Sequence, residues 1–301
     1  MLKSNTTSAS TRRVATVGTF DGVHRGHRRV LQMVKRLASE RNLEPLVVSF
    51  DRHPLQTIAP ERVPGLIQSP SRRANILYKE GFQLLTLEFT PALARHTAES
   101  WLELMHRQHG VDALVVGYDN TFGSDGTAME LADYKAIGAR VGVEVIEAPV
   151  EPHVSSSAIR KAVAAGDVEA ASRMLGYPFS ITGEVRPGKQ LGSSLGFPTA
   201  NVWPAYRAQF PANGVYCVDV EMPDGSLRRG VANIGRQPTV ANNAPVALEV
   251  HIPGIEGDLY GETLDVRFLR RLRDEIKFDS PQALARQIAL DVEEALQEGE
   301  N

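Results

Sequence analysis

Two histidines and three glycines lie close together in the stretch VGTFDGVHRGHRRVLQ at residues 17–32. His24 and His27 are three residues apart at an expected helix start, so both imidazoles can point at the same oxygen atoms. Gly18, Gly22 and Gly26 let the backbone approach a phosphate, and the free N–H groups of a helix start favour an anion. Imidazole N–H groups would stabilise charge that builds on phosphorus during a displacement. The spacing predicts a phosphate site, although a bare His-x-Gly-His turn could also be two surface caps.

A second candidate group lies in the segment ALEVHI at residues 247–252. Strand alternation puts Leu248 and Val250 on one face and Glu249 and His251 on the other. A carboxylate such as Glu249 can accept the proton of a neutral hydroxyl nucleophile. The residues alone, however, favour a solvated position on the outside of a strand.

A third group is the serine-rich segment VSSSAIRKAV at residues 154–163. Ser156 and Arg160 are four residues apart at an expected helix start, so they share one helical face beside the positive end of the helix dipole. That arrangement suits a polyphosphate. A simple helix cap explains the same residues equally well.

Strands and helices alternate over residues 13–149 and must position the first group. Short apolar runs at 13–18, 44–50, 82–89, 113–117 and 143–149 alternate with amphipathic segments, which is typical of a parallel sheet covered by helices. Helices are expected from the periodicity of Val30, Met33, Val34 and Leu37, and at about 71–80, 98–108 and 129–142. Ligands bind at the carboxyl ends of such strands, so the glycine-rich turn lies where a nucleotide site belongs.

The pattern changes after Pro178, where we place the domain boundary between residues 1–178 and 179–301. Alternating runs at 179–185, 214–222, 227–235, 246–252 and 262–269 are separated by turn residues, which favours antiparallel strands in a barrel or sandwich of about six strands. A terminal helix is expected from Ser280 as its cap and Pro281 as its first residue. The fold class is therefore α/β, with a parallel sheet followed by an antiparallel β-barrel.

Composition narrows the class of function. The chain has 301 residues, 42% of them hydrophobic, and a formal net charge of −3, so no basic face for nucleic acid is expected. The single cysteine, Cys217, excludes an intramolecular disulfide and a cysteine-rich zinc site. No apolar run reaches the length of a membrane span, and the start resembles no signal peptide. We expect a cytoplasmic protein with small-molecule substrates, no nucleic acid partner and no membrane partner.

Taken together, GTFDGVHRGH at residues 18–27 resembles the signature of the HIGH-superfamily nucleotidylyltransferases, in the form found in bacterial bifunctional riboflavin kinase/FMN adenylyltransferases (FAD synthetases). Further segments are similar to that family in the same order, between about residues 14 and 296: VVSFDRHP, VVGYDNTFG, VSSSAIRKAVAAGDV, LGFPTAN, NIGRQPT, ALEVHI and GDLYGETLDVRFLRRLRDEIKF. The resemblance implies that riboflavin is phosphorylated to FMN and that FMN is then adenylylated to FAD, with pyrophosphate released.

The resemblance also implies roles in the adenylyl transfer. FMN already carries an anionic phosphate, so this site needs charge neutralisation and alignment rather than a strong base. The implied ATP-binding residues are Gly18, Phe20, Asp21, His24, His27, Ser156 and Arg160, with both histidines catalytic. The implied FMN-binding residues are Asp119 and Asn120.

For the kinase reaction, the family resemblance makes Glu249 the candidate base for the riboflavin hydroxyl. Thr199 and Asn201 are implied as ligands of Mg²⁺ shared with ATP, because a hydroxyl and an amide oxygen are hard ligands. The implied ATP-binding residues are Gly188, Gly192, Gly196, Pro198, Thr199 and Asn201. Arg273 and Glu275 are implied as flavin-binding, although a structural salt bridge is an equal alternative.

Three positions depart from the family pattern: Ser193 stands for a common arginine, Asn120 for an aromatic residue, and Ala158 lies within the serine-rich motif. They bear on substrate affinity more than on reaction type. A pantetheine-phosphate or cytidylyl transferase would share the histidine turn but leave GFPTAN unexplained, and the charge and short length disfavour an aminoacyl-tRNA synthetase. A non-catalytic flavin- or nucleotide-binding protein is the remaining alternative.

Overall fold

The computed structural model describes residues 11–118, 120–188, 196–236, 246–255 and 258–297. Contacts divide the chain into two compact units. Unit 1 comprises residues 1–64 and 70–154, and unit 2 comprises residues 65–69 and 155–301. Each unit is described by itself.

Unit 1 is built on a five-stranded parallel sheet, as the alternating pattern predicts. Its strand order is β3-β2-β1-β4-β5, so the chain starts in the middle of the sheet and turns outward in both directions. Every residue of β1 is buried, which fits its mostly apolar sequence, in which only Arg13 and Thr16 are polar. The strands are β1 (Arg13–Val17), β2 (Glu44–Phe50), β3 (Gln83–Leu87), β4 (Val111–Val116) and β5 (Glu144–Glu147).

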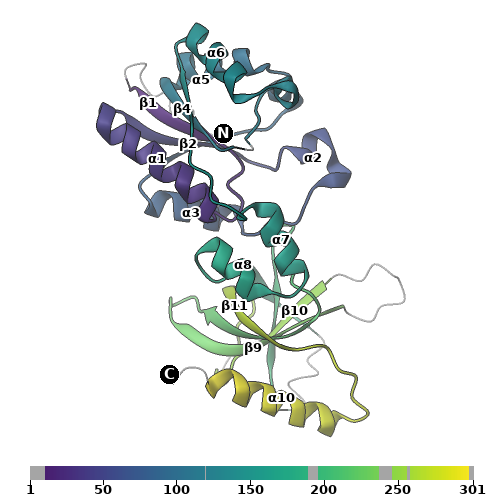
Figure 1. The fold of residues 1–301 in the computed structure, drawn as a ribbon. Coiled ribbons are helices and arrows are strands. Elements are labelled where there is room, and N and C mark those ends of the chain that lie inside the picture. The colour runs from purple at the N-terminus through teal and green to yellow at the C-terminus, as the bar shows by residue number, and fades with distance from the viewer. Residues whose placement is uncertain (1–10, 119, 189–195, 237–245, 256–257, 298–301) are drawn as a thin grey trace. The chain divides into compact units, whose positions relative to one another are not determined.

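Helices cover both faces of this sheet (Figure 1). On one face, α1 (Arg25–Arg41) and α3 (Pro70–Lys79) bury Leu31, Val34 and Leu77 against the strands. On the other face, α5 (Ala98–His109) and α6 (Leu131–Val141) bury a second apolar layer that includes Trp101 and Ile137. The shorter elements of unit 1 are α2 (Leu55–Ile58), η1 (Pro60–Arg62), α4 (Pro91–Ala94) and η2 (Gly126–Ala128).

Unit 2 is a closed barrel with strand order β10-β7-β6-β11-β8-β9. All of its strand pairs are antiparallel, as the turn-rich pattern predicts. The strands are β6 (Ser180–Arg186), β7 (Thr199–Trp203), β8 (Gly214–Glu221), β9 (Leu227–Arg236), β10 (Val246–His251) and β11 (Thr263–Arg273). The sequence pattern missed β7, because only five residues form it and its start is polar.

Two helices that precede the barrel in sequence belong to its core. In α7 (Ser156–Ala164) and α8 (Val168–Leu175), the apolar residues Ile159, Val163 and Leu175 join the buried cluster inside the barrel. The short segment 65–69 joins the same unit, because the backbone of Leu66 pairs with the segment at residues 207–209 and Ile67 is buried in the core.

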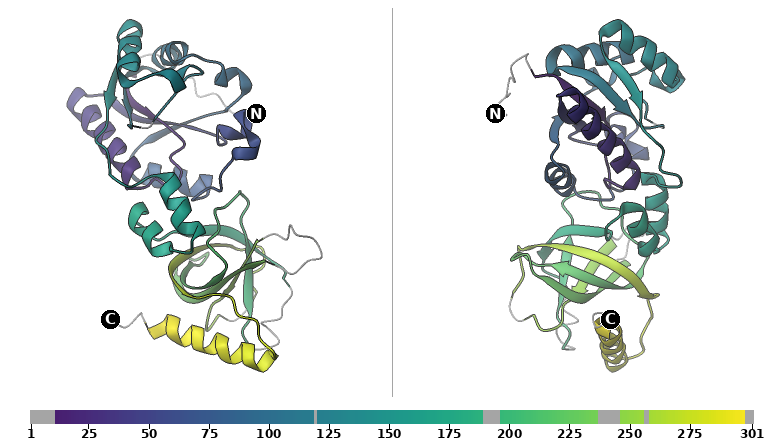
Figure 2. Two further views of the ribbon diagram at one scale, coloured as in Figure 1. Left: turned by 45° about the vertical axis from the view of Figure 1, so that its right-hand side comes forward. Right: turned by 60° about the vertical axis from the view of Figure 1, so that its left-hand side comes forward.

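The predicted terminal helix is α10 (Pro281–Leu296), and the Ser280 side chain caps it by accepting a hydrogen bond from the N–H of Ala283. Figure 2 shows α10 lying along the outside of the barrel. Val292 and Ala295 pack with Val215, Cys217 and Val231 from β8 and β9. Cys217 is buried there, as predicted for a strand residue in the core.

Candidate active sites

The turn between β1 and α1 has an unusual backbone. Gly22 has φ +91°, and two residues that are not glycine, Phe20 (φ +48°) and Val23 (φ +32°), also lie in the left-handed region. A β-branched residue there is strained, and such strain persists only where the surroundings impose it. Both side chains are fully packed, with exposures of 3% and 0%. At Gly18, a Cβ atom would lie 3.3 Å from the Phe20 ring, a tight contact that glycine avoids.

The two histidines are brought together as predicted. His24 is the N-cap of α1, and its Nδ1 accepts a hydrogen bond of 3.2 Å from the backbone N–H of His27. The two rings stack, with centroids 3.6 Å apart and planes 14° apart. Because Nδ1 is an acceptor, the neutral His24 ring carries its proton on Nε2. A Cβ atom on Gly26 would crowd the His24 ring at 3.2 Å, which explains the glycine between the histidines.

Two side chains from distant parts of the sequence hold this turn. The Arg73 guanidinium on α3 donates hydrogen bonds to the carbonyl oxygens of Thr19 (2.7 Å) and Phe50 (3.1 Å). Burial lowers the pKa of Arg73, and the charge of the buried Asp21 opposes that shift. Sequence reasoning missed Arg73, because it lies in an ordinary amphipathic helix and only the fold brings it to the turn.

Asn120 is the second of these side chains. Its Nδ2 donates a hydrogen bond of 2.6 Å to the carbonyl oxygen of Val17, the last residue of β1. The carboxamide therefore links the chain after β4 to the start of the glycine-rich turn. Its predicted contact with FMN stays a prediction, and Asp119 lies outside the described residues.

Ser156 and Arg160 lie in unit 2, at the start of α7. The side chain of Ser155 caps that helix by accepting a hydrogen bond from the N–H of Ala158, so an alanine at position 158 leaves the cap intact. The Nε of Arg160 donates to the carbonyl oxygen of Gly65 at 2.8 Å, within the same unit.

Glu249 faces a polar row on the barrel. In the pairing of β10 with β7, Glu249 lies opposite Asn201 and His251 opposite Thr199. Directly opposite residues share a face of the sheet. Leu248 is buried in the barrel core, so these four residues lie on the outer face. The structure thus brings together the candidate base and the two candidate metal ligands.

The segment before β7 is fixed by its neighbours. The Nδ1–H of His251 donates to the carbonyl oxygen of Pro198 at 2.8 Å, and the Phe197 ring meets the His251 ring edge-on at 5.4 Å. A Cβ atom on Gly188 would collide with the Asn201 carboxamide, so the backbone at 188 packs directly on that side chain. Gly196 has φ +84° in a turn, whereas Gly192 and Ser193 lie outside the described residues.

A cavity of about 260 Å³ opens beside Pro198 and Thr199. Apolar side chains from three strands and from the segment after β10 form most of its wall, and Asp258 and Tyr260 also line it. A planar base with polar edges suits such a slot next to a phosphate site. Its lining residues are Val185, Pro198, Thr199, Ala200, Val250, Ile252, Ile255, Asp258, Leu259 and Tyr260.

Arg273 and Glu275 have partners within unit 2. Arg273 donates to both carboxylate oxygens of Asp291 at 2.9 and 2.7 Å, and the Asp291 side chain is only 4% exposed. This is the salt bridge that the sequence left as the alternative to a flavin contact. Glu275 accepts a hydrogen bond of 3.0 Å from Asn213 and lies over Gly235 of β9.

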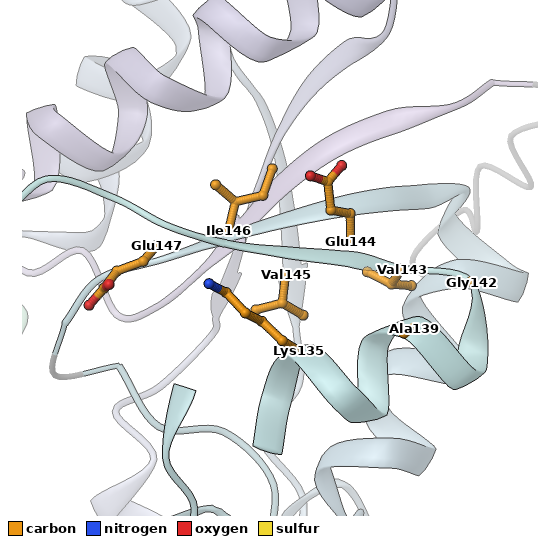
Figure 3. A pocket seen from close by; sticks show the side chains of 8 residues that line it. All are labelled: Lys135, Ala139, Gly142, Val143, Glu144, Val145, Ile146 and Glu147. Atoms are coloured by element: carbon orange, nitrogen blue, oxygen red, sulfur yellow. The ribbon is translucent and has the colours of Figure 1, made fainter. Parts of the chain in front are cut away.

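A wider hollow of about 730 Å³ lies beside the edge strand β5 and α6 (Figure 3). Lys135 and Val145 lie on one side of the strand, whereas Glu144 and Ile146 point to the other. None of the predicted site residues lines this hollow.

Two general features of the described residues bear on chemistry. No three His, Cys, Asp or Glu side chains among them are grouped in a way that could hold a metal ion. None of the helices within the described ranges is both long enough and apolar enough to cross a membrane.

A parallel sheet with a histidine pair at its carboxyl edge, together with a barrel that carries a carboxylate beside a hydroxyl and an amide, defines a two-part nucleotide-dependent transferase. A family model described as FAD synthetase matches residues 6–159, and one described as riboflavin kinase matches residues 175–298. The chain belongs to the family of bifunctional riboflavin kinase/FMN adenylyltransferases, as the motif resemblance predicts.

Several relatives carry that description. The protein of Pseudomonas fluorescens is 39% identical, and the alignment covers 93% of this chain and 90% of that protein. The proteins of Escherichia coli K12 (36%; 92% and 90% covered) and Bacillus subtilis (32%; 94% and 91% covered) are similar over the same extent. A solved Streptococcus pneumoniae structure, described as a macrolide-efflux protein, is 33% identical, covers 95% of this chain and 94% of its own, and has a TM-score of 0.84.

Proposed function

We propose that this chain makes both flavin nucleotides at two separate sites. The barrel transfers the γ-phosphoryl group of ATP to riboflavin and gives FMN and ADP. The parallel-sheet unit transfers AMP from a second ATP to FMN and gives FAD and pyrophosphate. The observation that carries the proposal is the pairing of Glu249 with Asn201 on the barrel, separate from the histidine stack of unit 1.

In the adenylyl transfer, a phosphate oxygen of FMN attacks the α-phosphorus of ATP, and the bond to the bridging oxygen of pyrophosphate breaks. No proton has to be removed from the nucleophile, so the residues act by alignment and charge stabilisation. His24 offers its Nε2–H, and His27 stacks beside it at the positive end of α1. Gly18, Phe20 and Asp21 shape the ATP site, and Ser156 and Arg160 bind the triphosphate.

The FMN side of this site is assigned to Asp119 and Asn120. Asn120 acts here by fixing the carbonyl oxygen of Val17 as well as by contact with FMN. Because Asn120 stands where the family usually has an aromatic residue, it changes how the isoalloxazine ring is stacked.

In the kinase reaction, the terminal hydroxyl oxygen of the ribityl chain forms the bond to the γ-phosphorus of ATP, and Glu249 accepts the proton of that hydroxyl. The bond between the γ-phosphorus and the bridging oxygen of ADP breaks at the same time. The segment with Gly188, Gly192, Gly196 and Pro198 holds the ATP phosphates, and the cavity beside Pro198 receives the base. Arg273 and Glu275 are assigned to the flavin side, with Arg273 acting through its salt bridge to Asp291.

Mg²⁺ fits the donor set on β7. Thr199 and Asn201 are two residues apart on one face, and Asn201 is held against Gly188 with 6% exposure. A hydroxyl and an amide oxygen are suitable ligands for a magnesium ion that keeps its other positions for water and phosphate. Bound there, Mg²⁺ would neutralise phosphate charge.

The remaining assignments follow from the same proposal. The boundary between the two functional regions is proposed near Pro178, although the apolar residues of α7 and α8 pack with the barrel core. The substrates are small molecules, no nucleic acid or membrane partner is proposed, and the cytoplasm, where ATP is abundant, is the proposed location.

The test is a time course with riboflavin, ATP and Mg²⁺, in which riboflavin, FMN and FAD are separated by chromatography. FMN that appears first and FAD that follows would support both sites. Flavin binding without any product would favour a non-catalytic binding protein, and turnover of pantetheine phosphate instead of flavin would favour the other transferase.

A further inference from the structure

The polar row on the outer face of the barrel continues one strand beyond the residues assigned above. In the pairing of β10 with β9, Glu249 lies directly opposite Asn233, so Asn201, Glu249 and Asn233 form one line across three strands. The neighbours of Asn233 along β9, Ala232 and Ile234, are buried in the core, which confirms that Asn233 is on the outer face. We propose that Asn233 binds hydroxyl groups of the ribityl chain of riboflavin.

The spacing of the strands supports this assignment. Neighbouring strands are about 4.8 Å apart, and opposite Cβ atoms about 5 Å apart. A polyol whose terminal hydroxyl lies at Glu249 therefore has its next hydroxyls within reach of one flanking strand. On the β7 side, Thr199 and Asn201 are assigned to the metal and phosphate. The rest of the ribityl chain then runs toward β9, where Asn233 is the directly paired side chain.

The contacts around Asn233 also support a ribityl chain that runs toward β9. A Cβ atom placed on Gly235 would lie 3.4 Å from the Asn233 Nδ2. The Glu275 carboxylate is close to the same point, so Asn233 and Glu275 are neighbours above Gly235. Gly235 pairs with Ala247, so small residues occupy the next level of both strands. Asn233 thus lies between the proposed base and Glu275, the residue assigned to the flavin. A carboxamide can both donate to and accept from hydroxyl groups, which suits a chain of alcohols.

A purely structural role would be expected to look different. Two residues earlier on the same face, Val231 is buried with Val215 and Ala295 of α10. Asn233 is only partly buried and carries a polar group at the level of Glu249 and Asn201. The outer face of β9 thus changes from apolar to polar at the level of the proposed kinase site.

The inference rests on the proposed assignment of Glu249, and the test uses the full chain with Asn233→Ala. Kinase kcat and KM are measured for riboflavin and for ATP, and FAD formation from supplied FMN is measured in the same preparation. Binding of lumiflavin, which has the ring system but a methyl group in place of the ribityl chain, is followed by flavin fluorescence. Asn75→Ala, an exposed change on α3, is the matched control.

We expect kcat/KM for riboflavin to fall about 10-fold, as for one or two lost hydrogen bonds. The KM for ATP, lumiflavin binding and FAD formation should stay within about twofold of the unsubstituted chain, the usual range for a change that touches none of those groups. Unchanged riboflavin kinetics, an equal fall in lumiflavin binding, or a parallel loss of FAD formation would each overturn the assignment. Kinase activity that survives Glu249→Gln would instead contradict the proposed base, while riboflavin binding would still report on Asn233.

Discussion

Replacing Arg73 by methionine tests how the glycine-rich turn is held. The guanidinium donates to Thr19 at 2.7 Å and Phe50 at 3.1 Å, and it lies near the buried Asp21. Hydrogen bonds from charged donors contribute about 1.5–3 kcal/mol each. Arg73→Met removes both and leaves the Asp21 charge without this cation. The packed rings and side chains of the turn still limit its movement, so we expect displacement of the turn rather than unfolding.

A displacement of about 1 Å near reacting groups costs about 100-fold in rate. We therefore expect FAD formation from FMN to fall about 100-fold, and riboflavin phosphorylation on the barrel to stay within about twofold, since substitutions away from a site usually have small effects. The two rates are measured separately by chromatography, after urea unfolding has confirmed that the variant is folded at the assay temperature. Arg36→Met, on the exposed face of α1, is the matched control.

Two outcomes would refute this reasoning. FAD formation within twofold of normal in a folded Arg73→Met protein would show that the turn does not need its tether. An equal fall in both reactions would show a general effect on the chain. Arg73→Lys keeps the charge but not the two-pronged donor, so its rate should lie between those of Arg73→Met and the unsubstituted chain.

Three other predictions follow from the described contacts. Glu249→Ala should abolish FMN formation and spare FAD formation from supplied FMN, and His27→Ala should do the reverse; one substitution that eliminates both activities in a folded protein would contradict the division between sites. Asp291→Ala removes a buried carboxylate and leaves the partly buried Arg273 guanidinium without this partner, so urea unfolding should show a loss of about 3 kcal/mol, the low end for a broken buried pair. A change under about 1 kcal/mol, the value of an exposed pair, would refute the structural role of Asp291. Burial and the nearby Arg13 lower the pKa of His109 below its ordinary 6.5. Because the unfolded chain then takes up the proton first, the free energy of unfolding should fall as pH drops through 6.5. His109→Gln should flatten this pH dependence, and an unchanged dependence would exclude His109 as its source.

The sequence predicted the sheet well because each of its strands carries a local signal. A mostly apolar run without regular alternation, such as that of β1, is itself the consequence of burial on both faces. The strand β7 was missed because it is short and two of its first three residues, Thr199 and Asn201, are polar. Those two side chains lie on the outer face, opposite His251 and Glu249 of β10. The polar and apolar residues do alternate there, with Ala200 and Val202 toward the core, but five residues are too few for that alternation to stand out from a loop.

Contacts that depend on tertiary structure were out of reach of the sequence. The Arg73 side chain meets the carbonyl oxygen of Thr19, 54 residues away along the chain, and no local periodicity signals that contact. Likewise, the opposition of Glu249 to both Asn201 and Asn233 depends on strand order and register, because a slip of one residue would move Glu249 to the core face. The residue types could be read from the sequence, but their pairing could not.

The two candidate sites are built by different means, and this determines what each can tolerate. The transferase site uses a backbone turn with Phe20 and Val23 in left-handed conformations, so its geometry depends on packing and on tethers such as Arg73. The kinase site uses regular strands, where register alone brings Glu249 and Asn201 together. A side-chain change on the barrel therefore removes one chemical group and leaves its neighbours in place. A change beneath the turn displaces several backbone groups at once, even when the altered residue never touches a substrate.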